Sequence, residues 1–95
     1  MARVEKNAAS GCYELRVDGH TAQVEYRDED HGTVRLIHTE VPKALEGRGV
    51  GSMLARGVPD TIRAEGRTVV PQCEFIAAYI DRHPEYQDLM SADRK

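Results

Sequence analysis

The sequence predicts an α+β fold in which a mixed, mainly antiparallel sheet carries two principal helices in the order β-β-β-α-β-α. Apolar and polar side chains alternate over residues 13–41, as they do in half-buried strands. The apolar spacing becomes helical over residues 50–62, and a short apolar strand and a second helical segment follow. A chain of 95 residues suffices for one domain. We therefore expect residues 1–95 to form a single domain, with flexible ends at 1–11 and 91–95.

The first two strands form a predicted hairpin. Its apolar faces consist of Tyr13, Leu15 and Val17 in the first strand and Ala22, Val24 and Tyr26 in the second. The pair Asp18-Gly19 lies between them and favours a two-residue turn, because both turn positions need a positive φ. The polar segment Asp28–Gly32 breaks the alternation, so we expect a second turn there.

The third strand is predicted over Thr33–Val41. Pro42 ends it, because proline has no N–H group to donate to a strand ladder. Strict alternation places four side chains on one face, namely Val34, Leu36, His38 and Glu40.

The helical segment begins after a glycine-rich stretch and presents its apolar or small residues on one side. These are Val50, Met53, Leu54, Gly57, Val58, Thr61 and Ile62. Pro59 removes one helical hydrogen bond, which predicts a kink or an early end of the helix, and Gly66 is a typical helix stop. Val69-Val70 then predicts a short buried strand.

The second helix is predicted over Glu74–Arg82, and Pro84 ends it. One side of this helix carries Phe75, Ala78, Tyr79 and Arg82.

Composition excludes several classes of function. The net charge of −3 and the absence of basic runs argue against a nucleic-acid-binding protein. No apolar run approaches the ~18 residues of a membrane span, and the N-terminus has no secretory h-region. Cys12 and Cys73 lie far apart and show no metal-ligand spacing. We therefore expect a cytoplasmic monomer with two free thiols and no metal.

Three alternate glycines between the third strand and the first helix form the most specific segment. Gly47, Gly49 and Gly51 allow a close backbone approach to a ligand. The helix N-terminus behind them has unpaired N–H groups and a positive dipole end, so the loop suits phosphate or pyrophosphate. Arg48 and Ser52 would add side-chain donors. The alternative is that these glycines only make a tight turn. The Walker and Rossmann patterns do not fit.

The segment resembles the acetyl-CoA pyrophosphate loop of the GNAT N-acetyltransferase superfamily, whose pattern is Gln/Arg-x-x-Gly-x-Gly/Ala. The residues 46–51 match at both glycines and depart at Glu46, where Gln or Arg is usual. Four motifs in order are similar to the small YjdJ-like branch of about one hundred residues, namely His38-Thr-Glu-Val-Pro42, the glycine loop, Val70-Pro-Gln-Cys73 and Arg82-His-Pro-Glu-Tyr86. The likeness runs from about Leu15 to Met90, and Pro59 is a departure.

The resemblance implies a minimal GNAT-like fold that binds acetyl-CoA or coenzyme A as co-substrate. The backbone of Thr39, Glu40 and Val41 would bind the pantetheine amides, and the thioester would lie near Cys73. The loop residues that would hold the pyrophosphate are Gly47, Arg48, Gly49, Val50, Gly51 and Ser52. Arg82 and His83 would contact a CoA phosphate, or form a solvated helix end that the dipole favours.

Three side chains are candidates for catalysis. His38 and Glu40 are two apart on one strand, and either would take a proton from an attacking amine, which is mostly charged near pH 7. Cys73 replaces the Asn of larger relatives at a helix start, where a thiolate is stabilised and would accept the acetyl group. The Tyr that usually protonates the leaving thiolate aligns with Ile80. The alternatives are a buried Cys73, a core His38 and a solvated Glu40.

We expect an N-acetyltransferase that acts on a small-molecule amine, a lysine or an N-terminus of a protein or peptide. The missing Tyr equivalent favours either a route through Cys73 or weak activity. The alternative is a non-catalytic regulatory module that binds CoA or acetyl-CoA. A third reading, a structural domain with a tight glycine turn, requires that CoA does not bind.

Overall fold

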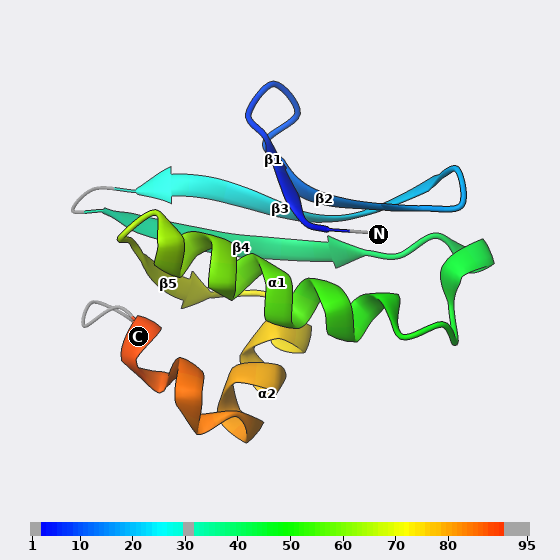
Figure 1. Ribbon diagram of the computed structural model, residues 1–95. Coiled ribbons are helices and arrows are strands. Elements are labelled where there is room, and N and C mark those ends of the chain that lie inside the picture. Colours follow the sequence, from blue (N-terminus) through cyan, green and yellow to red (C-terminus); the bar gives the residue numbers. More distant parts are fainter. Residues whose placement is uncertain (1–2, 30–31, 91–95) are drawn as a thin grey trace.

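A single five-stranded sheet has the order β1-β2-β3-β4-β5, and both helices lie on one of its faces (Figure 1). The computed structural model describes residues 3–29 and 32–90. The strands are β1 (Glu5–Asn7), β2 (Cys12–Val17), β3 (His20–Glu29), β4 (Thr33–Glu40) and β5 (Thr68–Pro71). The helices are α1 (Val50–Ala64) and α2 (Glu74–Arg82), with the 3-10 helices η1 (Lys43–Leu45) and η2 (Pro84–Leu89). Strands β4 and β5 pair in parallel and the other neighbouring strands pair antiparallel, which confirms the predicted mixed α+β class.

The β2–β3 hairpin forms at the predicted turn. Val17 pairs with His20, and Asp18 and Gly19 have φ values of 50° and 80°. The second turn begins later than predicted, because β3 continues through Asp28 and Glu29. Their charges face outward and bind Arg67 and Arg35, so polar residues remain in the ladder. The remaining turn positions 30–31 lie outside the described residues.

Strand β1 is an edge strand that the sequence pattern did not predict. Its residues Glu5, Lys6 and Asn7 are all polar, yet they pair with β2. The Lys6 ammonium lies 5.2 Å from the centre of the Tyr26 ring, so this lysine contacts the sheet through a cation–π interaction. Residues 5–7, within the end predicted to be flexible, form this paired strand, and residues 91–95 lie outside the described part of the chain.

Helix α1 supplies most of the helical side of the core. Its buried residues are Val50, Leu54, Ala55, Val58, Pro59 and Ile62. The helix does not end at Pro59, which is itself buried, and it continues to Ala64. Gly66 has a φ of +73° and its N–H group bonds the Arg63 carbonyl, a Schellman stop at the predicted glycine. Met53, expected on the buried side, is 37% exposed.

Helix α2 has the predicted bounds but presents a different side to the sheet. Ile76 and Ile80 are fully buried, whereas Phe75 and Ala78 are exposed. Both sides of this helix carry apolar residues, so its sequence alone did not show which side faces the core. None of the helices in residues 3–29 and 32–90 is long and apolar enough to cross a membrane.

Candidate functional site

A bulge in β4 decides where the candidate catalytic side chains point. Leu36 pairs with Tyr26, but His38 pairs with Glu25, so Ile37 is an extra residue in β4. The alternation shifts by one residue at this point. Leu36 and Thr39 therefore both face the helices.

His38 and Glu40 lie on the opposite, open face of the sheet. Leu36 is fully buried, whereas the side chains of His38 and Glu40 are exposed. The prediction that they share a face with Val34 and Leu36 is wrong, because strict alternation does not survive a bulge. The Gln23 amide donates a hydrogen bond of 3.5 Å to the Glu40 carboxylate on this face. The two candidate bases still share a face with each other.

Strands β4 and β5 separate beyond Leu36. Their ladder runs from Thr33–Thr68 to Leu36–Pro71, and the Cys73 N–H then donates to the Leu36 carbonyl at 2.9 Å. After this bond the described residues place no further strand against that edge of β4. The backbone groups of this edge are consequently available for a ligand that lies along it.

The glycine loop follows this open edge and leads into α1. Gly47 and Gly49 have φ values of +80° and +76°, and Gly49 is the N-cap of the helix. A Cβ atom at either position would meet nothing within 4 Å, so the backbone borders open space. The Met53 N–H bonds the Gly49 carbonyl at 3.1 Å, and the N–H groups that precede it in the first turn have no partner within the helix. This geometry suits an anion.

A pocket of about 430 Å³ lies between the glycine loop, the end of β4 and the start of α2. That volume is in the usual range of small-molecule sites. Its lining residues are Thr39, Val41, Leu45, Glu46, Gly47, Gly49, Val50, Gly51 and Phe75. Six of these residues, all but Leu45, Glu46 and Phe75, are among the predicted cofactor-binding residues.

Phe75 lines the pocket, although the sequence indicated only that it lies on one side of the second helix. Its ring lies against the backbone of Gly51, because a Cβ atom at Gly51 would be 3.0 Å from the Phe75 Cζ atom. The side chain is 43% exposed, an unusual position for a large apolar residue. One feature of the sequence could have indicated this role. Phe75 lies in the first turn of the second predicted helix, close to the segment that was expected to bind the ligand.

Cys73 does not line the pocket itself but contacts Thr39, which does. Its Sγ atom is 3.0 Å from the Thr39 Oγ1 atom, and the residue is 8% exposed. Cys73 is also the N-cap of α2, so its thiol lies beside the positive end of that helix. The structure thus brings Cys73 to the pocket side of β4 and leaves His38 and Glu40 on the other side.

The remaining predicted cofactor ligands lie outside the pocket lining. The Arg48 guanidinium is 2.6 Å from the Asp18 carboxylate in the β2–β3 turn, and Ser52 is exposed on α1. Arg82 and His83 are at the opposite end of α2 from Cys73, at about 1.5 Å per residue roughly 13 Å away.

Ile80 and Tyr79, near the end of α2, lie at and beside the position where the resemblance places a proton-donating Tyr. Ile80, at the position where the resemblance places a Tyr, is fully buried. The ring of Tyr79 stacks on His83 with the ring centres 3.9 Å apart, and His83 Nδ1 is 2.7 Å from the Tyr79 carbonyl oxygen. Neither Ile80 nor Tyr79 lines the glycine-loop pocket.

Comparisons with known proteins agree with this geometry. The sequence model of a family described as GCN5-related N-acetyl-transferase matches residues 12–89. Protein NATD1 of Xenopus tropicalis is 32% identical over 84 residues, which cover 86% of this chain and 77% of that protein. Protein NATD1 of Homo sapiens is 31% identical over 84 residues, with 86% and 74% covered.

The fold also matches a solved structure. It is similar to the NMR structure of a GCN5-like putative N-acetyltransferase from Staphylococcus aureus, with a TM-score of 0.69 and 23% sequence identity. The match covers 94% of this chain and 87% of the other.

Proposed function

This chain belongs to the GCN5-related N-acetyltransferase family, and we propose that it binds acetyl-CoA in the glycine-loop pocket and transfers the acetyl group to an amine. We assign it to the small YjdJ-like branch, as a cytoplasmic monomer. The observation that carries the proposal is the continuity of three features. An open β4 edge, two left-handed glycines and an unpaired helix N-terminus line one pocket.

The phosphate end of the ligand is assigned to the start of α1. Gly47, Gly49 and Gly51 present backbone without side chains, and the first-turn N–H groups supply donors. Arg48 is held by Asp18 through a pair in which both side chains are well exposed. Such a pair stabilises the protein by no more than about 1 kcal/mol. A bound phosphate would therefore readily replace Asp18 as the partner of the Arg48 guanidinium.

The thiol end of the ligand is assigned to the end of β4. The backbone of Thr39, Glu40 and Val41 would take the place of a strand partner and bond the pantetheine amides. The exposed Phe75 ring would cover the arm on the other side. This path leads to Thr39 and Cys73, where the thioester carbonyl would lie.

Two routes for transfer follow from the two faces of β4. In the covalent route the Cys73 thiolate attacks the acetyl carbon, CoA leaves as its thiolate, and an amine then takes the acetyl group and restores the thiol. In the direct route the amine attacks from the open face, where His38 or Glu40 accepts its proton. The acceptor is a small-molecule amine or an amino group of a protein or peptide.

A second candidate function is supported by the Ile80 position. Because Ile80 is fully buried and has no hydroxyl group, the leaving thiolate has no Tyr proton donor there. A protein that binds acetyl-CoA without transfer, as a regulatory module, would tolerate this. Release of free thiol from acetyl-CoA in the presence of an amine panel separates the enzyme from the module.

The cofactor assignment is tested by a matched glycine pair. Gly49→Ala places a methyl group in the pocket and should weaken acetyl-CoA binding at least about tenfold, which isothermal titration calorimetry measures. Gly66→Ala, at the other end of α1, has nearly the same φ and the same open surroundings. Both variants should lose about 1 kcal/mol of stability, because L-residues are strained in this region. Equal affinity in both variants and the wild type would refute the assignment.

A further inference from the structure

The glycine-loop pocket carries a negative charge where the proposed function places a phosphate. Among the described residues that line it, only Glu46 is charged. The Glu46 carboxylate forms no ion pair within residues 3–29 and 32–90. A bound phosphate would therefore meet a like charge beside the backbone of Gly47 and Gly49.

The cationic side chain of the same loop is held outside the pocket. Gly47 and Gly49 both line the pocket, whereas Arg48, which lies between them, does not. The Arg48 Nη2 atom is 2.6 Å from a carboxylate oxygen of Asp18, in the turn between β2 and β3. This ion pair joins the glycine loop to the hairpin turn and directs the guanidinium to a carboxylate of the protein instead of to a ligand.

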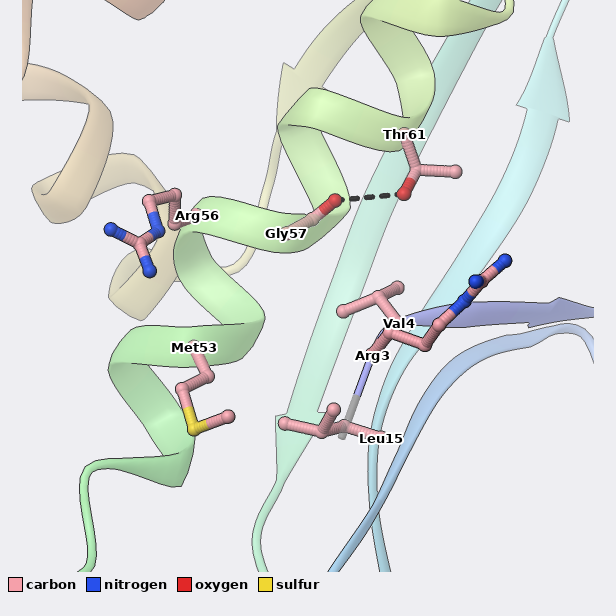
Figure 2. Close-up of a pocket in the computed structure, with 7 residues that line it drawn as sticks. All are labelled: Arg3, Val4, Leu15, Met53, Arg56, Gly57 and Thr61. Carbon is pink, nitrogen blue, oxygen red and sulfur yellow. Dashed lines mark hydrogen bonds between the residues drawn. The ribbon is translucent and has the colours of Figure 1, made fainter. Parts of the chain in front are cut away.

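The neighbouring cations in the sequence do not line the pocket in place of Arg48. Lys43 is exposed in η1, just before the loop. Arg56, in the second turn of α1, lines a separate pocket of about 380 Å³ (Figure 2). The two pockets share no lining residue. The charges next to the phosphate end are therefore those of four side chains, namely Asp18, Lys43, Glu46 and Arg48, and their formal charges cancel.

We propose that the Asp18–Arg48 pair is an autoinhibitory contact, in which Asp18 competes with the phosphate groups of acetyl-CoA for Arg48, and that Glu46 opposes the same phosphates from the pocket lining. This inference rests on the proposed function, because it concerns the phosphate end of that ligand. On binding, the Arg48 guanidinium would leave Asp18 and pair with phosphate oxygens. Removal of either carboxylate would therefore raise the affinity for acetyl-CoA.

Asp18→Asn tests the contact without disturbing the hairpin. Asp18 has a φ of 50°, and Asn is as well suited as Asp to this turn position before a glycine. The variant should bind acetyl-CoA about threefold more tightly in isothermal titration calorimetry, the usual effect of an exposed ion pair. Asp88→Asn is the matched control. The side chains of the Arg63–Asp88 pair are 45% and 72% exposed, against 47% and 67% for Arg48–Asp18, and neither Arg63 nor Asp88 lines the pocket. This control should leave the affinity unchanged.

Glu46→Gln tests the second carboxylate. This variant should also bind acetyl-CoA about threefold more tightly, and the double variant with Asp18→Asn about tenfold, because the two carboxylates come from different elements. Added salt should weaken acetyl-CoA binding more in the double variant than in the wild type, since Lys43 and Arg48 then have no opposing carboxylate. S-acetylpantetheine, which has no phosphate groups, should bind the wild type and all the variants equally, as measured by amide NMR shifts.

The outcomes separate this inference from the proposed function. Tighter binding of acetyl-CoA, but not of S-acetylpantetheine, by the Asp18 and Glu46 variants supports the inference. Equal acetyl-CoA affinities in the wild type and the double variant would overturn it and leave the proposed function in place. The same gain for S-acetylpantetheine, or in Asp88→Asn, would also overturn it, because the effect would not come from phosphates at Arg48. If neither the wild type nor any variant binds acetyl-CoA, both the inference and the proposed function are wrong.

Discussion

The two halves of β4 have different roles although they belong to one continuous strand. Over Thr33–Leu36 the strand has partners on both sides, and Val34 and Leu36 are fully buried. Over Ile37–Glu40 it keeps only β3, and the side facing β5 is open. The first half holds the sheet together, and the second half forms one wall of the pocket.

The bulge at Ile37 separates these halves and explains the difference. Beyond it Thr39 faces the helices and Cys73, whereas His38 and Glu40 face away from them. The second half can therefore offer one side to a ligand and the other side to a second reactant. Substitutions in the first half should change stability, and substitutions in the second half should change binding or transfer.

The largest effect is expected from Leu36→Ala in the first half. Removing a fully buried Leu side chain should lower the free energy of unfolding by about 2–5 kcal/mol, a large part of the ~5–15 kcal/mol typical of a domain. Urea denaturation measures this. Ile37→Ala, one position later and only partly buried, is the control and should lose much less. Equal losses at both positions would contradict the division of the strand.

The next effect concerns the open face of the second half. A variant with both His38→Gln and Glu40→Gln should release thiol from acetyl-CoA, with an amine panel, about 100-fold more slowly, because both candidate bases are removed. Its acetyl-CoA affinity should stay the same, since these side chains point away from the pocket. Arg27→Gln, exposed on β3 beside the first half, should leave the rate unchanged. An unchanged rate in the double variant would exclude both bases.

The smallest effect on stability is expected from Thr39→Val. The change keeps the shape of a half-buried side chain and removes its hydrogen bond to Cys73, so the loss should be about 1 kcal/mol. Acetylation of Cys73 by acetyl-CoA, followed by mass spectrometry, should slow several-fold. Cys12 is the internal control, because burial raises the pKa of its thiol and keeps it unreactive. Absence of acetyl from Cys73 in the wild type would leave the direct route.

Local chemistry in the sequence was enough to place most of the elements. The Asp18-Gly19 turn, the helix stop at Gly66 and the bounds of α2 depend on neighbouring residues, and they were predicted. The edge strand β1 was not, because its polar residues show no apolar alternation and pair only through contacts with β2. The prediction of which side of α2 faces the core was also wrong, because Ile76 and Phe75 are both apolar and the sequence does not distinguish the two sides.

The candidate site was predictable in part for the same reason. The glycine loop is a local feature, and Gly47, Gly49 and Gly51 do line the pocket together with Thr39 and Val41. Phe75 enters the pocket only because α2 packs against α1 at Gly51. The positions of Arg48 and His83 depend on partners elsewhere, Asp18 in the hairpin turn and Tyr79 one helical turn earlier.

The sequence by itself determined the fold class, the glycine loop at a helix start and the types of residue available for chemistry, because these depend on backbone preferences of neighbouring residues. Only the tertiary structure decided which face of β4 each candidate side chain occupies. A single extra residue, Ile37, reverses the alternation, and whether a strand accommodates it depends on its register with β3. Cys73 and Thr39 meet on one side of the strand, and His38 and Glu40 stand on the other.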